Sequence, residues 1–455
     1  MKLKGLLLFI VMALLLISFT ACDSKKNKKA NTENNKSESN LKIYYMNSDI
    51  SVQNALAKFR GKYKNVNIDD NIFHNAEEYK TKVTMDILAG EGPDVIFLRP
   101  KWFESVNKFS SSGVLCDLNE FIKKDKDFNM SDYNENVLNS FEQDGKRLTI
   151  PLAFNFNIFT TSKETLQRNN IKIDLSNWNY NGLLQVVREF QEENKGKNKY
   201  FFSNDFSISN LIKGSGISFV DFKNKKSMFN SKDFIEMLEM YKELYPSICT
   251  DEAVKDIPTN KCLEDGIYIM KASSKTSPRA LSSDYSLYKS VGEEMEIYPF
   301  PTLKGEKSSP VAYQEESVGI NSQSENKGTA YEFIKILMSK DLQIEYSLKN
   351  ILMGISVNKY AYEEDLKYYM SKEFGDGSGL MYEESGTYEV KSVPLPETIK
   401  TQLENIISRV SKCEIEDAEI LNIAKEALPD FLSGRKTAAQ TAKEIDGKVN
   451  LYLNE

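Results

Sequence analysis

The chain has few of the residues on which metal-dependent and nucleophilic enzymes rely. Its 455 residues include a single histidine, His74, and five cysteines without a Cys-x-x-Cys pair. A histidine-based metal site, a Ser/His/Asp triad and a zinc site are therefore not expected. We predict no metal, no cofactor and no enzymatic activity, and we place His74 at the surface. The adjacent carboxylates Glu315 and Glu316 are expected to form a solvated face.

The chain also has fewer positively than negatively charged residues. The formal net charge is −7 at pH 7, and no basic stripe runs along the chain. Nucleic acid is therefore not an expected partner. Four cysteines lie in the body of the chain: Cys116, Cys249, Cys262 and Cys413. We expect isolated thiols, with a short disulfide loop between Cys249 and Cys262 as the alternative.

The beginning of the chain is typical of a secretory signal. Lys2 and Lys4 precede an apolar segment at residues 6–17, which rises only about 18 Å as a helix, short of the roughly 30 Å hydrocarbon core. Small residues then precede Cys22, a pattern that resembles the bacterial lipobox. We predict a lipoprotein signal peptide at residues 1–21, lipid chains on Cys22 and a disordered tether at 22–40. The protein would be anchored at the extracellular face of the cell membrane. A plain secretory signal is the alternative.

Hydrophobic periodicity predicts an α/β fold. Strands are expected at residues 41–46, 66–68 and 95–98, and helices at 52–63 and 79–88. Gly92 and Pro93 stop the second helix before the apolar run Val-Ile-Phe-Leu at 95–98. Such alternation favours a largely parallel sheet with helices on both faces. Ligands of such sheets bind beyond the carboxyl ends of the strands, which draws attention to the loop after residue 98.

A second α/β unit is expected further along the chain. Residues 154–159 alternate with period two, and there the chain should leave the first unit; Asn155 and Asn157 face either solvent or a crevice. We expect a return at residues 297–301 and a long flexible insertion at 367–390, which is rich in glycine. The other expected elements are strands at 200–202, 266–270 and 317–321, and helices at 102–109, 183–190, 234–244, 329–339, 404–410, 418–428 and 437–452.

Six segments in order resemble the family 1 extracellular solute-binding proteins of ABC importers, the family of maltose-binding protein. They lie at residues 90–98, 145–152, 319–327, 331–335, 354–359 and 432–455. The resemblance implies a two-lobe, type II periplasmic-binding-protein-like fold, in which hinge crossovers join two lobes, each a mostly parallel sheet flanked by helices. The implied first lobe is 41–152 plus about 301–355. The second is 153–300 plus about 356–455.

The resemblance also implies a ligand site and a function. The ligand-binding candidates, carried over by position, are Leu98, Arg99, Trp102, Asn155, Asp205, Phe206, Ser273, Ser274 and Thr276. The expected protein is a lipid-anchored monomer that captures a small solute, with an oligosaccharide as the leading ligand class, and delivers it to ABC transporter permease subunits. A protein that presents a non-sugar solute to a membrane sensor kinase is the alternative, and an extracellular glycosidase is a more distant one.

The chain departs from sugar-binding relatives in its tryptophans. Such proteins stack several aromatic rings on pyranose faces, whereas this chain has only Trp102 and Trp178. Trp178 matches a packing position of the family at a helix start, and we assign it to the core.

Overall fold

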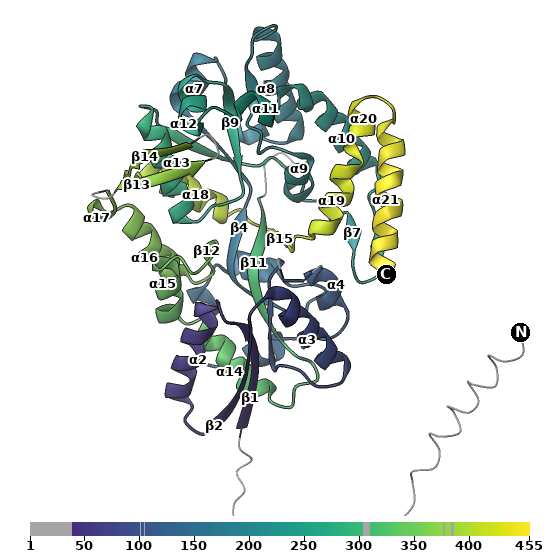
Figure 1. Ribbon diagram of the computed structural model, residues 1–455, viewed down its shortest axis with the longest axis vertical. Coiled ribbons are helices and arrows are strands. Elements are labelled where there is room, and N and C mark those ends of the chain that lie inside the picture. Colours follow the sequence, from purple (N-terminus) through teal and green to yellow (C-terminus); the bar gives the residue numbers. More distant parts are fainter. Residues whose placement is uncertain (1–38, 101, 104, 304–309, 376–377, 384–385) are drawn as a thin grey trace, which may run out of the picture. The chain divides into compact units, whose positions relative to one another are not determined.

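The structure is a computed structural model, which describes residues 39–100, 102–103, 105–303, 310–375, 378–383 and 386–455. Residues 39–455 form one compact unit (Figure 1). The signal peptide predicted at 1–21, the lipidation site Cys22 and nearly all of the tether lie outside the described residues. No helix in the described part of the chain is long and apolar enough to cross a membrane.

Seven strands form the first sheet, in the order β12-β4-β11-β3-β1-β2, with β15 paired to β11. Strands β2 and β3 pair with β1 in parallel, whereas β11 is antiparallel to both β3 and β4, so the sheet is mixed. The strands are β1 (Ser39–Met46), β2 (Val66–Phe73), β3 (Val95–Leu98), β4 (Ile150–Phe156), β11 (Val311–Ile320), β12 (Ile355–Ser356) and β15 (Lys412–Glu414).

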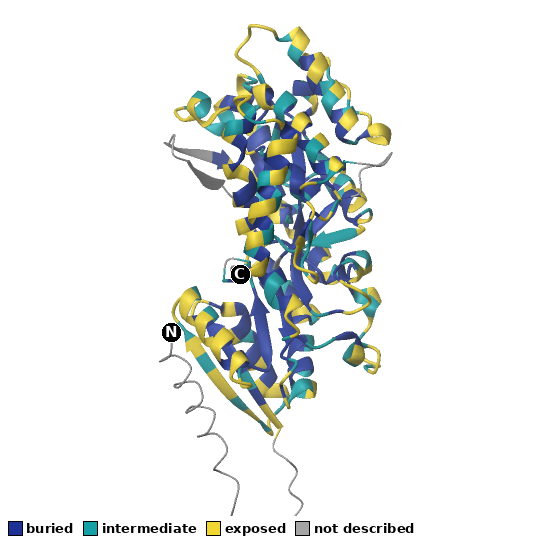
Figure 2. Cartoon of the chain, turned by 90° about the vertical axis from the view of Figure 1, so that its right-hand side faces the viewer, coloured by how far each residue is buried: buried dark blue, intermediate teal, exposed yellow. Residues whose placement is uncertain are grey.

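Helices cover this sheet with their apolar faces. In α2 (Ile50–Lys62) the Asp49 side chain caps the first turn, and Val52, Leu56 and Phe59 are buried. The spacing of these residues places them on one face of a helix, as the sequence predicted. Figure 2 shows the consequence, with the central strands buried, the edge strand β2 partly exposed and the outer faces of the helices exposed.

The segment around Gly92 joins α3 (Ala76–Leu88) to β3. Gly92 has φ +115°, a conformation that favours glycine, and the predicted helix stop is confirmed. The next acidic residue, Asp94, is buried and accepts hydrogen bonds from the Lys42 backbone amide at 2.7 Å and the Ser324 hydroxyl at 2.5 Å. Asn321 donates to the Pro93 carbonyl at 3.2 Å. Residues 90–98 and 319–327, two of the segments that resemble the family, are therefore joined by hydrogen bonds. These contacts lie before β3 and not in the loop after it.

Four strands form the second sheet, in the order β10-β5-β9-β6. The chain enters it directly after β4, within the segment 154–159 where the sequence predicts that the chain leaves the first unit. It leaves after β10, which still pairs with β5. The strands are β5 (Ile158–Ser162), β6 (Tyr200–Phe202), β9 (Tyr268–Ser273) and β10 (Met295–Pro299). The exact lobe boundaries stay a prediction.

The second sheet contributes to a hydrophobic cluster that includes Trp178. This side chain is 1% exposed and donates through Nε1 to the Pro299 carbonyl at 2.7 Å, which fits the predicted packing role. His74 is exposed, as expected. Cys116, Cys249, Cys262 and Cys413 are free thiols, so the alternative of a Cys249–Cys262 disulfide is not realised.

Some predicted elements differ from the structure. The helix expected at 102–109 is α4 (Val106–Ser111), because Ser105 caps its start, and the one expected at 404–410 is α18 (Glu397–Ile407). The segment 367–390 is not a featureless insertion. It contains the end of α16 (Lys359–Tyr369), α17 (Lys372–Gly375) and a hairpin of β13 (Ser378–Glu383) and β14 (Gly386–Lys391).

The remaining helices and short strands lie around the two sheets (Figure 1). They are α5 (Asn119–Ile122), α6 (Glu135–Ser140), α7 (Lys163–Arg168), α8 (Tyr180–Glu193), α9 (Ile208–Gly214), β7 (Val220–Asp221), β8 (Lys226–Ser227), α10 (Lys232–Leu244), α11 (Asp251–Val254), α12 (Thr259–Glu264), α13 (Pro278–Ser290), α14 (Lys327–Leu337), α15 (Lys340–Leu348), α19 (Ala418–Glu426) and α20 (Leu428–Leu432), with short 3-10 helices at Met130–Asp132, Leu175–Asn177 and Tyr245–Ser247.

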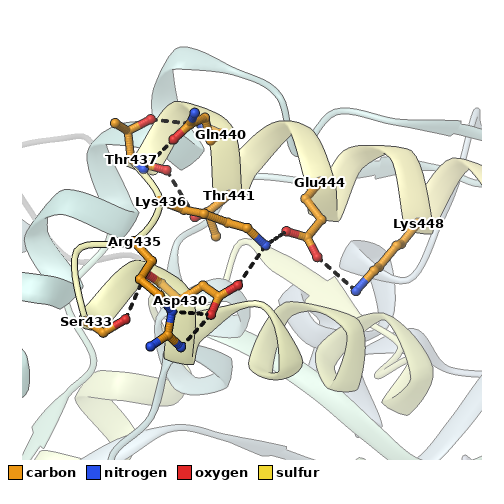
Figure 3. Close-up of polar contacts among 9 residues, drawn as sticks. All are labelled: Asp430, Ser433, Arg435, Lys436, Thr437, Gln440, Thr441, Glu444 and Lys448. Atoms are coloured by element: carbon orange, nitrogen blue, oxygen red, sulfur yellow. Dashed lines mark hydrogen bonds and ion pairs between the residues drawn. The ribbon is translucent and has the colours of Figure 1, made fainter.

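The chain closes with α21 (Ala438–Asn454), whose start is fixed by a capping box. Thr437 and Gln440 exchange hydrogen bonds between side chain and backbone, at 2.9 and 3.2 Å (Figure 3). The Lys436 ammonium group forms ion pairs with the Asp430 carboxylate at 3.0 Å and with the Glu444 carboxylate at 2.6 Å. Both carboxylates are paired, so this polar cluster serves to fix the helix rather than to bind a ligand.

Candidate ligand-binding site

The loop after β3 holds an ion triad rather than a free cation. Arg99 pairs with Asp49 at 2.9 Å and with Glu316, and its guanidinium lies 4.2 Å from the centre of the Trp102 ring. The Glu316 side chain is only 13% exposed, so the predicted solvated face is wrong for this residue. A bulge between Gln314 and Ser317 in β11 turns Glu316 toward Arg99. Burial raises the pKa of Glu316, and Arg99 opposes that rise.

Trp102 is held from two sides. Its ring packs edge-on against the Tyr79 ring, with the ring centres 5.0 Å apart, and it also contacts the Arg99 guanidinium. It remains partly accessible, whereas Leu98 is fully buried in β3. Of the candidates in this loop, Trp102 and Arg99 thus keep accessible surface, and Arg99 is already paired with two carboxylates.

Asn155 connects segments that are far apart in the sequence. Its Nδ2 donates to the Met353 carbonyl at 2.8 Å, and its Oδ1 accepts from the Thr276 amide and hydroxyl at 3.1 and 3.2 Å. We refer to Asn155, Thr276 and Met353 as the Asn155 cluster. Asn155 and Asn157 are both buried, so these alternating asparagines do not face solvent. The solvent-facing alternative is therefore wrong, and the crevice-facing one stays a prediction.

Tyr313 reinforces the same junction. Its hydroxyl donates to the Ser274 carbonyl at 2.7 Å and lies 3.4 Å from Asn157 Oδ1. Ser274 and Thr276, in the loop after β9, therefore form hydrogen bonds with residues of β11 and β4, respectively. Ser273 is half-buried, and its hydroxyl is hydrogen-bonded within its own loop to the backbone of Lys275.

Asp205 and Phe206 have opposite environments. Asp205 is exposed; partial desolvation raises the pKa of its carboxyl group, and Lys271 opposes this rise. Phe206 is 2% exposed and stacks on Phe202, with the ring centres 4.1 Å apart. Its ring faces are occupied by other core rings in this structure, and only Asp205 is open to a ligand.

A cavity of about 200 Å³ is lined in part by residues that follow Thr276 and by residues that precede Met353 in the sequence, and we call it the tyrosine pocket. Three of its lining residues are aromatic, and the rings of Tyr368, Tyr369 and Phe374 contact one another with centres 5.0 to 6.1 Å apart. The other lining residues are mainly polar: Arg279, Ser282, Ser283, Ser286, Asn350 and Ser392, with Leu348 and Val390.

The tyrosine pocket is built by α13, by the end of α16 and by the loop after α15. Arg279 lies three residues after Thr276, and Asn350 three residues before Met353, so the pocket and the Asn155 cluster share these segments. Asn350 Oδ1 accepts a hydrogen bond from the Tyr369 hydroxyl at 3.1 Å. Sequence reasoning missed this pocket because Tyr368, Tyr369 and Phe374 fall in the segment treated as a flexible insertion. The aromatic pair at the end of an amphipathic helix was the available signal.

No group of three or more His, Cys, Asp or Glu side chains in the described part of the chain is arranged to hold a metal ion. The arrangement offers aromatic surface, hydrogen-bonding groups and one arginine. These groups suit non-covalent binding of a polar solute.

Comparison with known proteins decides the family. Residues 54–371 match the model of the bacterial extracellular solute-binding protein family. The chain belongs to this family. As an extracellular solute-binding protein it shares its fold with many solved structures, at sequence identities that show the fold alone.

The sugar-binding protein MalE from Xanthomonas citri matches with a TM-score of 0.63 at 14% identity, covering 91% of this chain and 97% of that one. The substrate-binding protein Lmo0181 from Listeria monocytogenes, in complex with cycloalternan, matches with a TM-score of 0.56 at 14% identity, covering 91% and 99%. A de novo designed cysteine esterase also matches, with a TM-score of 0.62 at 16% identity, covering 92% and 98%.

Proposed function

We propose that this solute-binding protein captures an oligosaccharide and that the tyrosine pocket receives one of its sugar units. The observation that carries the proposal is the aromatic wall beside Arg279 and Asn350, in which Tyr368 is 37% exposed and Phe374 is partly exposed, while Tyr369 is buried. Aromatic faces pack on the apolar faces of sugar rings, and polar groups around them fix orientation. This pocket supplies the aromatic surface that the two tryptophans alone do not provide.

The remaining contacts are proposed to come from the candidate residues that are still accessible. Trp102, Asp205 and Ser273 are partly or fully exposed, whereas Leu98, Asn155, Phe206 and Thr276 are buried. The buried members would act by holding the loops that carry the contacts. Ligand binding would favour a closed arrangement of the two lobes by its differential affinity for that arrangement.

Two further steps complete the proposal. Lipid chains on Cys22 would keep the monomeric protein at the extracellular face of the membrane, and the loaded protein would deliver its ligand to ABC permease subunits. Support comes from the family and from the lipobox-like sequence before Cys22. Palmitate labelling that is lost in Cys22→Ser tests the anchor. Unlabelled, freely secreted protein would contradict it.

A thermal-shift screen tests the ligand class. Mono- and oligosaccharides, amino acids, peptides and polyols are added to the purified protein. A ligand at a hundred times its dissociation constant raises the free energy of unfolding by about 2.7 kcal/mol, which a melting curve resolves. A shift with oligosaccharides is expected. A shift with another class alone would favour the sensor alternative or a different transported solute, and uptake of labelled ligand in cells with and without the protein separates transport from sensing.

A further inference from the structure

We infer that the sugar unit in the tyrosine pocket is acidic and that its carboxylate pairs with Arg279. This inference rests on the proposed function, because it names the chemical class of the saccharide. It is argued from the charges and the free hydrogen-bonding groups around the pocket.

Arg279 is the only charged side chain that lines the pocket in the described part of the chain. It is exposed and has no ion-pair partner among the described residues, whereas Arg99, Arg147 and Arg188 each pair with a carboxylate. Arginine presents donors in a fork that matches a carboxylate with two parallel hydrogen bonds. An unpaired arginine that lines a cavity beside aromatic rings is suited to such a partner on the ligand.

The other polar groups of the pocket reinforce this preference. Asn350 Oδ1 already accepts from Tyr369, and Ser286 Oγ accepts from the Val393 amide at 3.0 Å. Of the other polar groups, the Asn350 amide nitrogen and the Arg279 guanidinium are donors only, and the hydroxyl groups of Ser282, Ser283 and Ser392 can donate as well as accept. Arg279 also lies in the first turn of α13, where the helix dipole adds positive potential.

Carboxylate acceptors are absent among the described residues of the pocket wall. Neither Asp nor Glu is among the described residues that line the pocket. Carboxylates are strong acceptors for sugar hydroxyl groups, so a pocket for a neutral sugar would be expected to include one. The buried Asp365, one helical turn before Tyr369, does not line the pocket. Burial raises the pKa of Tyr369 to about 12; the Asp365 charge adds to this rise and the Arg279 charge opposes it.

Because the net charge of the chain is −7, binding of an anionic sugar depends on the positive charge of Arg279. An anionic ligand is repelled by the protein as a whole, so its binding depends on a compensating positive charge at the site. Binding should therefore weaken as salt screens the Arg279 interaction.

Calorimetric titration with matched sugars tests the inference. The probes are glucuronate with glucose, galacturonate with galactose and mannuronate with mannose, together with the trimers of each. Acidic members are expected to bind at least tenfold more tightly than their neutral partners. Arg279→Gln should weaken acidic binding about tenfold to a hundredfold, the range of a charge-assisted hydrogen bond, and weaken neutral binding by much less, so that the preference for the acidic sugar is lost. Arg188→Gln, on the exposed face of α8, is the matched control and should change neither.

The outcomes separate the inference from the proposed function. Equal or tighter binding of the neutral sugars, or uronate binding that Arg279→Gln leaves intact, overturns the inference and keeps sugar binding. Binding of sugar phosphates without uronates also overturns it. Failure of every saccharide overturns the proposed function and the inference together. If Arg279→Gln does not fold, the salt dependence of the parent decides: acidic binding should fall with added salt, and a salt-independent affinity would contradict the ion pair.

Discussion

Asp365 offers a quantitative test of the packing of α16. Its side chain belongs to a residue that is 5% exposed, and its Oδ1 atom has no hydrogen-bond partner among the described residues. Desolvation raises its pKa from 3.8 to about 7. The folded protein therefore holds this proton more tightly than the unfolded chain does.

The sign of the effect on stability follows from linkage. Stability from this group is fully present below pH 4 and is lost as the pH rises through 7, because the unfolded chain ionises first. At 1.36 kcal/mol per pKa unit, the loss is about 1.7 kcal/mol at pH 5 and about 4 kcal/mol at pH 8. Asp365→Asn removes the titration. Relative to the parent, the free energy of unfolding of the variant should rise by about 2 to 3 kcal/mol between pH 5 and pH 8.

Urea unfolding followed by circular dichroism, at pH 5, 6, 7 and 8, measures this difference. Glu363→Gln is the matched control, because Glu363 is an exposed carboxylate on the same helix, and it should leave the pH profile of the parent unchanged. If Asp365→Asn and the parent keep the same stability difference at every pH, Asp365 is not a desolvated carboxyl group and the packing described for α16 is incorrect.

Two further substitutions probe the junction and the loop after β3. Gly354→Ala should lower the free energy of unfolding by about 1 to 3 kcal/mol in urea, because its Cβ would lie 2.7 Å from the Phe154 carbonyl oxygen and 2.9 Å from Asn155 Nδ2. Gly447→Ala, with open space around its Cβ on α21, is the control; equal losses would contradict the close approach. Trp102→Ala should weaken oligosaccharide binding at least tenfold and cost about 1 kcal/mol of stability from the lost Arg99 contact. Unchanged affinity in calorimetry would restrict Trp102 to supporting Arg99.

The fold was predictable because its signals are local. Apolar spacing located α2 and α3, and Gly92 with Pro93 marked the turn into β3. The position of Asn155 next to a crossover also followed from the alternation of residues 154–159. These features depend on periodicity and backbone conformation, which a single sequence carries.

The contacts that decide the site were not predictable in the same way. Glu316 turns inward because of a bulge in β11, and its partner Arg99 lies more than two hundred residues away, as does Asp49, the other carboxylate that pairs with Arg99. Phe206 follows a polar run yet stacks into the aromatic core. The tyrosine pocket brings together α13 and the end of α16, about ninety residues apart, and no local pattern encodes that meeting.

Calorimetric titration of Tyr368→Ala with oligosaccharides that shift the melting of the parent tests the central claim most directly. Tyr368 lines the tyrosine pocket and is 37% exposed, and Tyr360, 41% exposed on the same helix but outside the pocket, provides the control Tyr360→Ala. Loss of one stacked ring should weaken binding about tenfold in Tyr368→Ala, with Tyr360→Ala equal to the parent. Equal affinities for all three proteins would show that the sugar does not bind in this pocket.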